Sequence, residues 1–348
     1  MCRDTRKSRG EVGASSCRSQ GARQGCINEE LTKVLTETNG GELQILGPEL
    51  ASCLNWAGAV EALRLGHTFP RATISDTLTP MAKGELLTRS AAIEGMGAGT
   101  KSVTIRPDNP ERSPPAPSVQ GLFTLFDEGR GHPIGLVNGA LLTLWKTVAD
   151  SLLGAHYLAS SDAKSLAVIG TGPIAKGLLE GYTTLYPQLT DIRVWGRKRE
   201  RARAIADAVP SNVVVCETAE AAVRGADIVT SATGSKSPII MGGWIKKGAH
   251  VDLVGAHGPE MREADNELLA TASLFVDSRE TVLDHIGELR IPIAKGVVKA
   301  SDVLGDLYEL VGGDDLERYR NATTVFKNGG GAHLDLMMAT YFFEQARK

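Results

Sequence analysis

The chain has few cysteines, little net charge and no long apolar run. Its five cysteines, among 348 residues, show neither CxxC spacing nor the spacing of a metal-binding set. We therefore expect no disulfide framework, no metal site and a location in the reducing cytoplasm. The formal net charge of -3 argues against a surface that generally binds nucleic acid. No apolar run approaches the ~20 residues that cross a bilayer, so we expect no membrane association.

The first 42 residues differ in composition from the rest. They are rich in Arg, Ser and Gly and lack periodic apolar positions, which predicts disorder. They also lack the apolar core of a secretory signal. We interpret them as a dispensable extension or the product of a wrongly chosen start codon. A transit peptide is the alternative, and Asp4 and Glu11 argue against it.

Residues 158–330 alternate short apolar runs with helical patterns. Six runs are predicted as strands: 165–170, 192–196, 213–217, 227–233, 249–256 and 273–278. Fully apolar strands separated by helices are typical of a parallel sheet that is covered on both faces. The sequence therefore predicts an α/β protein with a Rossmann-type, doubly wound nucleotide-binding domain.

Residues 43–157 form a second unit with a strand-rich, α+β pattern. Strands are expected at 43–46, 99–107, 121–128 and 132–140, and a helix is expected over 49–66. The Pro-rich segment 107–117 predicts a long surface loop. A strong helical pattern over 139–159 leads into the first Rossmann strand. The helix expected near the C-terminus, within residues 331–348, should pack back on this unit and complete it.

The residues after the first predicted Rossmann strand form a dinucleotide-binding turn. Gly170, Gly172 and Ala175 give GxGxxA spacing, with Pro173 and Ile174 at the start of the following helix. Glycines let backbone amides approach a pyrophosphate, and a helix N-terminus favours the anion. A tight turn without a ligand is the alternative. The strand before the turn and the helix after it favour a cofactor site.

The second Rossmann strand ends in a basic segment that bears on the choice of coenzyme. Arg197, Lys198 and Arg199 stand where NAD-preferring sites place an acidic residue. Arg197 can pair with a 2′-phosphate through two N–H groups, so we expect NADPH, with NADH as the alternative. A solvated basic helix start is the other interpretation. Thr233 and Gly234, at the end of the fourth strand, are expected along the cofactor.

Several segments together resemble the ornithine cyclodeaminase/mu-crystallin family. They are VIGTGPIAKG, IRVWGRKRERARAIA, ADIVTSATGSKSPI, WIKKGAHVDLVGA, MREADNEL and TTVFKNGG. The resemblance runs from about residue 43 to the C-terminus. It implies a homodimer in which the strand-rich unit dimerises and holds the substrate beside the nicotinamide. The family includes cyclodeaminases, reductases of imines and ketimines, alanine dehydrogenases, and crystallins that bind thyroid hormone.

The resemblance also assigns roles to residues that composition alone would leave as surface groups. Arg71 matches the arginine that clamps the carboxylate of an amino or imino acid. Lys101 matches a lysine that assists carboxylate binding or proton transfer, and Lys146 stands where cyclodeaminases carry a second arginine. Gln120 is expected to line the substrate pocket, with an ordinary strand-end residue as the alternative. Asn328 lies where the family closes its chain near the nicotinamide; a plain glycine-rich loop is the alternative.

His257 marks a departure from the cyclodeaminase pattern. Cyclodeaminases have an aspartate at this place, in a Gly-Asp-x-Pro-Gly-Lys segment, and that aspartate is implied to handle the amine and its water. We expect His257 to lie near the imine nitrogen, as a proton donor or a pocket residue. Together with Lys146, it favours the ketimine reductase branch. The other histidines have no spacing that suggests a metal, and we interpret them as scattered: His67, His132, His285 and His333 are among them.

The sequence thus predicts an NADPH-dependent reduction of a cyclic ketimine. The expected substrates are 1-pyrroline-2-carboxylate and 1-piperideine-2-carboxylate, which yield L-proline and L-pipecolate. In this reading Arg71 anchors the carboxylate and Lys101 supports it. One alternative is ornithine cyclodeaminase, which forms L-proline and ammonia from L-ornithine. Another is a mu-crystallin-like protein that binds NADPH and a ligand without turnover.

Overall fold

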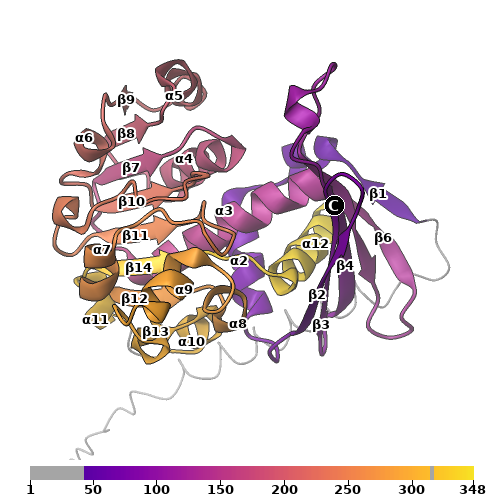
Figure 1. Cartoon of the computed structure of the whole chain (residues 1–348). Coiled ribbons are helices and arrows are strands. Elements are labelled where there is room, and N and C mark those ends of the chain that lie inside the picture. Colours follow the sequence, from indigo (N-terminus) through magenta and orange to yellow (C-terminus); the bar gives the residue numbers. More distant parts are fainter. Residues whose placement is uncertain (1–42, 314–316) are drawn as a thin grey trace, which may run out of the picture.

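The computed structural model describes residues 43–313 and 317–348, which form two β-sheets joined by long helices (Figure 1). One sheet is mixed and has six strands; the other has eight strands, all parallel. The predicted fold class, a Rossmann-type sheet plus a strand-rich α+β unit, is confirmed. The predicted extension, residues 1–42, lies outside the described residues. Within the described part, no helix has the length and apolarity to cross a bilayer.

The six-stranded sheet comes from the N-terminal part of the described chain. Its strands are β1 (Gln44–Leu46), β2 (Thr73–Pro80), β3 (Glu85–Ile93), β4 (Gly97–Ile105), β5 (Val119–Phe126) and β6 (Pro133–Asn138). They lie in the order β1-β6-β5-β4-β3-β2, and only β1 and β6 pair in parallel. Strands β2 and β3 fall outside every predicted run. Most of their residues are exposed or half-buried, so they lack the apolar pattern that marks a core strand.

The helix predicted over 49–66 is two elements. A 3-10 helix, η1 (Pro48–Cys53), is followed by α2 (Trp56–Gly66). Asn55 separates them because its backbone is extended, and its side chain accepts a hydrogen bond of 2.8 Å from the amide of Gly58. An asparagine in this conformation is a favoured helix N-cap, so the apolar pattern continues across a point where the helix has to start anew.

The eight-stranded sheet contains all six predicted Rossmann strands and two more. Its strands are β7 (Ser165–Ile169), β8 (Asp191–Trp195), β9 (Val213–Val215), β10 (Ile228–Ser231), β11 (His250–Leu253), β12 (Ser273–Val276), β13 (Val303–Gly305) and β14 (Thr324–Lys327). Their order is β13-β12-β14-β11-β10-β7-β8-β9. The unpredicted β14 lies between β11 and β12, so the residues after it reach the carboxyl edge of the sheet, where ligands bind in such folds.

Helices cover the sheets and connect them. They are α3 (Gly139–Leu158), α4 (Pro173–Leu185), α5 (Arg199–Ala206), α6 (Ala219–Val223), α7 (Asn266–Thr271), α8 (Arg279–Val282), α9 (Gly287–Ala294), α10 (Leu307–Gly312), α11 (Glu317–Arg320) and α12 (Ala332–Ala346), with short 3-10 turns η2 (Asn109–Glu111), η3 (Gly242–Trp244) and η4 (Ala300–Asp302). Figure 1 shows α3 running between the two sheets, and α12 lying on the inner face of the six-stranded sheet.

One core cluster extends through both sheets by way of α3. Trp145 of α3 stacks on Trp56 of α2, with ring centroids 4.0 Å apart. On the opposite side of the cluster, Gly154 packs against Phe326 of β14 so closely that a Cβ would lie 2.7 Å from the ring. Each fully buried aliphatic or aromatic side chain here stabilises the fold by roughly 1.5 to 3 kcal/mol. This packing fixes the two sheets relative to each other and so positions any site between them.

Candidate active site

The glycines after β7 leave an open space at the start of α4. Gly170 has a φ of +128°, and a Cβ there would lie 2.5 Å from the carbonyl oxygen of Ala232, so only glycine fits. Gly172 has an ordinary φ of -86°, and apart from Gly172 and its two chain neighbours no heavy atom of the described residues lies within 4 Å of the position a Cβ would take. The space in front of the first amides of α4 is therefore open to a pyrophosphate.

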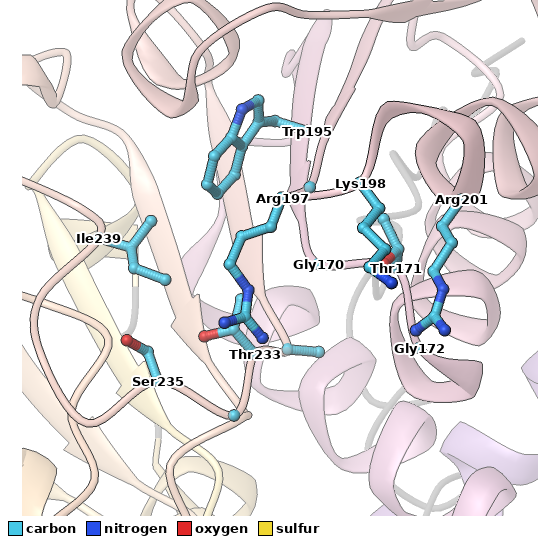
Figure 2. Close-up of a pocket in the computed structure, with 13 residues that line it drawn as sticks. Gly170, Thr171, Gly172, Trp195, Arg197, Lys198, Arg201, Thr233, Ser235 and Ile239 are labelled. Atoms are coloured by element: carbon cyan, nitrogen blue, oxygen red, sulfur yellow. The ribbon is translucent and has the colours of Figure 1, made fainter.

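That space is part of a cavity of about 550 Å³ at the carboxyl edge of the eight-stranded sheet (Figure 2). Six of the predicted cofactor residues line it: Gly170, Gly172, Arg197, Lys198, Thr233 and Gly234. The other three predicted from the turn, Pro173, Ile174 and Ala175, do not line it. Ala175 is fully buried behind the turn, since α4 begins at Pro173 and carries it into the core. Sequence reasoning missed further lining residues: Thr171, Trp195, Gly196, Arg201, Ala232, Ser235 and Ile239.

Three cations and no carboxylate line this cavity among the described residues. Figure 2 shows Arg197 extending toward Thr233 and Ser235, while Lys198 and Arg201 lie on the side of Gly172. Arg201 is in the first turn of α5, and Arg197 lies just before that helix. Both belong to the basic run 197–201, which could have revealed Arg201 from the sequence. The donor set suits a nucleotide with phosphate groups, and it holds nothing that would repel a 2′-phosphate.

A buried glutamate ties the cofactor edge together. Oε1 of Glu263 accepts hydrogen bonds from the hydroxyl of Ser231 and from the amide and hydroxyl of Thr233, at 2.6 to 2.8 Å. Oε2 accepts from the amides of Gly255 and Ala256, at 2.5 and 3.2 Å. The loops after β10 and β11 are thereby held by one side chain. Burial raises the pKa of Glu263, while these hydrogen bonds oppose that shift.

His257 is exposed at this edge. It lies in the loop after β11, and its Nδ1 is 2.9 Å from the carbonyl oxygen of Gly255. Because a carbonyl only accepts, Nδ1 is the donor in this hydrogen bond. The imidazole thus shares its loop with the two amides that bind Glu263.

Arg71 is held by a carboxylate of the protein itself. Its Nη1 and Nη2 donate to the two carboxylate oxygens of Asp306 at 2.8 and 3.0 Å. The guanidinium also lies 4.6 Å from the ring centre of Tyr308, whose hydroxyl accepts a hydrogen bond from the amide of Ala72. Asp306 is the N-cap of α10, so this pair links the segment before β2 to the Rossmann half of the molecule.

Lys101 and Lys146 are brought together beneath the first turn of α12. Lys101 Nζ is 2.8 to 2.9 Å from the carboxylate oxygens of Asp335, and both side chains are buried. Burial lowers the pKa of Lys146, and Lys101 lowers it too, while Asp335 and Asp150 raise it. A Cβ on Gly330 would collide with Lys146 Nζ, which places this ammonium against the loop after β14.

Two other predicted residues have different surroundings. The Asn328 side chain donates to the carbonyl of Thr147 and to Ser151 Oγ, both at 2.9 Å. It therefore fastens the loop after β14 to α3. Gln120 is exposed near the start of β5, and its backbone carbonyl accepts from Thr104 Oγ1 at 3.4 Å. It lines neither the coenzyme cavity nor the buried lysine cluster.

The described residues contain no group of three or more potential metal ligands. The charged groups instead form two neighbouring sets, a cationic nucleotide cavity and a buried set around Lys101 and Lys146. The loop after β14 contacts the second set through Gly330, and β14 pairs with β11. The loop after β11 is linked to the first set through Glu263, which accepts hydrogen bonds from both Gly255 and Thr233. Such an arrangement can hold a small anionic substrate next to the end of a dinucleotide.

Comparisons with known proteins give matches over most of the chain. The sequence model of the ornithine cyclodeaminase/mu-crystallin family matches residues 68–348. The Delta(1)-pyrroline-2-carboxylate reductase of Paracoccus denitrificans is 46% identical over 292 residues, which cover 83% of this chain and 92% of that protein. The Thermococcus litoralis Delta(1)-pyrroline-2-carboxylate reductase, solved with NADH and L-proline, is 26% identical with a TM-score of 0.80, covering 88% and 98% of the two chains. An archaeal alanine dehydrogenase dimer with bound NAD has the same identity and TM-score and covers 88% and 96%.

Proposed function

Because this chain belongs to the ornithine cyclodeaminase/mu-crystallin family, we propose that it is an NAD(P)H-dependent reductase of a cyclic ketimine. Its preferred reaction is the conversion of 1-pyrroline-2-carboxylate to L-proline; the six-membered 1-piperideine-2-carboxylate, giving L-pipecolate, is the second substrate. The observation that carries the proposal is the 46% identity to a Delta(1)-pyrroline-2-carboxylate reductase over most of both chains.

For the coenzyme, we propose NADPH in preference to NADH. The support comes from this chain's own residues, since Arg197, Lys198 and Arg201 line the cavity and no carboxylate accompanies them among the described residues. A guanidinium binds a phosphate through two parallel N–H groups, whereas a preference for NADH usually depends on a carboxylate for the ribose hydroxyls. The bound coenzyme supplies the hydride.

For the substrate, the protein has to bind a carboxylate and keep the ring fixed and dry. Arg71 offers a planar fork, and the ammonium groups of Lys101 and Lys146 supply positive charge in a buried place where it is poorly screened. A low-dielectric position strengthens attraction to an anion, and it also excludes the water that would hydrolyse an imine. These three cations are therefore our proposed carboxylate site.

The loop after β11, which carries His257, suits imine reduction better than ammonia release from ornithine. At the place where cyclodeaminases carry an aspartate, this chain has the imidazole of His257, which is exposed and engages Gly255 through Nδ1. A cyclodeaminating cycle needs a base for the substrate amine and a group that guides attack on the imine. Reduction needs neither, and His257 then serves at most as a neighbour of the imine nitrogen.

We also propose a homodimer that forms through the six-stranded sheet. Ile45 is 68% exposed and Leu122 is 43% exposed, although both belong to strands of this sheet. Exposed apolar side chains on a sheet are typical of an interaction surface. Light scattering is expected to give the mass of two chains for the wild type and of one chain for Leu122→Glu. A wild-type monomer would contradict the proposal.

The function is tested with purified protein, NADPH and 1-pyrroline-2-carboxylate. We expect a loss of NADPH absorbance that depends on the imine, and L-proline as the product. Parallel assays with NADH, with 1-piperideine-2-carboxylate and with L-ornithine separate the alternatives. Ammonia release from ornithine, without NADPH oxidation by any cyclic imine, would overturn the reductase assignment. Binding of NADPH without either reaction would favour the non-catalytic, crystallin-like role.

A further inference from the structure

Two histidines that are far apart in the sequence lie together in the structure. His67 directly follows α2, and His333 is in the first turn of α12. Their ring centroids are 5.8 Å apart and their planes are nearly perpendicular, at 89°. His67 is 4% exposed and His333 is 3% exposed, so both imidazoles are inside the protein. They are therefore a buried pair, which no local pattern in the sequence predicts.

The tautomer of His67 follows from its hydrogen bond. Nδ1 lies 2.7 Å from the carbonyl oxygen of Leu63, and because this oxygen can only accept, Nδ1 carries the proton. Nε2 then presents a lone pair, and it has no hydrogen-bond partner within the described chain. Burial lowers the pKa of His67 to about 4, so the ring is neutral near pH 7. Nε2 of His333 likewise has no partner in the described part of the protein.

The pair lies among the cations that we assign to the substrate carboxylate. The edge of His67 meets Tyr308, with centroids 4.7 Å apart, and the Arg71 guanidinium lies over the same tyrosine. His333 is near enough to Lys146 for that ammonium to lower its pKa, although burial is the larger cause. It is also two residues before Asp335, the partner of Lys101.

A third histidine shows that a buried, unpartnered nitrogen is not in itself the sign of a ligand. His250 of β11 is 1% exposed, its Nδ1 pairs with the hydroxyl of Thr324 at 2.9 Å, and its Nε2 has no partner among the described residues. Its pKa is lowered by burial alone, with no charged group involved. What distinguishes His67 is its place beside Arg71 and Asp306.

We propose that Nε2 of His67 accepts the N–H of the protonated substrate imine, with His333 as the facing wall of the same subsite. The inference rests on the proposed function. A site with several cations attracts the carboxylate but repels a C=N–H⁺ group, so the nitrogen needs an acceptor that bears no proton. The lone pair on Nε2 of His67 is already buried away from water, so its hydrogen bond to the substrate N–H adds little desolvation free energy. His67 is thus a specificity residue that selects acids with a ring N–H beside the carboxylate.

The test compares two ligands that differ in this one donor. Pyrrole-2-carboxylate has a ring N–H, and furan-2-carboxylate has an oxygen in its place. Titration calorimetry with the protein–NADP⁺ complex should give the wild type a preference for the pyrrole acid of about tenfold, the value of one hydrogen bond. In His67→Asn the preference should vanish, because asparagine can keep the bond to Leu63 while removing the acceptor at Nε2. His67→Gln, whose longer side chain returns an acceptor, should restore part of the preference.

His250→Asn is the matched control, since it changes an equally buried imidazole in the same way. It should keep the tenfold preference, and similar melting temperatures of the two Asn variants would show that folding does not explain the difference. A preference that persists in His67→Asn, or no preference in the wild type, would overturn the inference. Either result can occur while the protein still reduces cyclic imines, so failure of the inference is distinct from failure of the proposed function.

Discussion

Asp306 engages both terminal nitrogens of Arg71, at 2.8 and 3.0 Å, with its carboxylate buried and the arginine side chain 56% exposed. This geometry is the one an arginine adopts toward the carboxylate of an amino or imino acid. The protein's own carboxylate therefore occupies the fork that we assign to the substrate. Arg279 lies 3.9 Å from Asp306 and remains as a second cation if Arg71 turns away.

Weakening this pair should improve substrate binding. In Asp306→Asn the neutral amide still caps α10, because asparagine is a good N-cap, but it loses the charge that competes for Arg71. The KM for the cyclic imine should fall about threefold, a modest change because the pair is partly exposed to solvent. Steady-state kinetics at fixed NADPH measures it. Asp302→Asn, which changes an exposed acid in the preceding 3-10 turn η4, is the control. A rise in the KM for the cyclic imine would contradict the assignment of Arg71 to the substrate site.

Reversing one charge should change the coenzyme preference. Arg197→Asp replaces a cation that lines the cavity with a carboxylate that repels a 2′-phosphate. We expect kcat/KM for NADPH to fall roughly a hundredfold, the value of a charge-assisted, two-point contact, with a much smaller change for NADH. Arg199→Ala is the control, since Arg199 pairs with Glu217 and does not line the cavity. An unchanged ratio of the two coenzymes would exclude a role of Arg197 in selectivity.

A buried aspartate gives a prediction about pH. Burial raises the pKa of Asp252 to about 7, against about 3.9 in an unfolded chain. Between these values the folded protein holds a proton that the unfolded chain has lost, so this group's contribution to stability falls as pH rises toward 7. Asp252→Asn lacks the effect. Relative to the wild type, it should gain roughly 2 to 4 kcal/mol between pH 4 and pH 7.5 in urea unfolding. A difference that does not vary with pH would contradict the assignment.

Glu263 should matter for both stability and coenzyme binding. Its two oxygens accept five hydrogen bonds, and in Glu263→Gln the amide N–H₂ would face donors. We expect a loss of about 2 to 4 kcal/mol in unfolding free energy and weaker NADPH binding, because Thr233 loses its anchor. Glu260→Gln, an exposed neighbour in the same loop, should change neither. Equal effects of the two substitutions would disprove the structural role of Glu263.

The parts of the fold that the sequence predicts are those with local signals. Apolar runs bounded by glycines and helices mark six of the eight Rossmann strands, and the turn at Gly170 is a contiguous motif. Strand β13 (VLG) is followed directly by Asp306, and β14 (TVFK) has a polar residue at each end, so neither belongs to a longer apolar run. Strands β2 and β3 are ordered by pairing with each other and with β4, while most of their side chains stay at least partly accessible. Long-range pairing, not local propensity, decides them.

In the candidate site, too, residues with a local sequence signal could be predicted, whereas long-range contacts could not. Arg197 and Thr233 follow strand ends and could be placed by rule. The hydrogen bond between Arg71 and Asp306 joins residues 235 positions apart. The local sequence around either residue does not predict this pairing. Lys101 could be expected near a substrate by resemblance, but not its pairing with Asp335. From the sequence we interpret lone histidines such as His67 as scattered residues, because the role of a single histidine depends on the residues that the fold places next to it.

The position of α12 determines when the substrate half of the protein can be completed during synthesis. This helix covers β3 and β4, yet it is translated after the whole eight-stranded sheet. A ribosome adding about 5–20 residues per second needs roughly ten to forty seconds to proceed from β6 to α12. During that time β3 and β4, which pack against α12 in the finished molecule, lack their covering helix. The nucleotide-binding half can therefore fold first, and the nascent substrate half is the part that chaperones would have to shield.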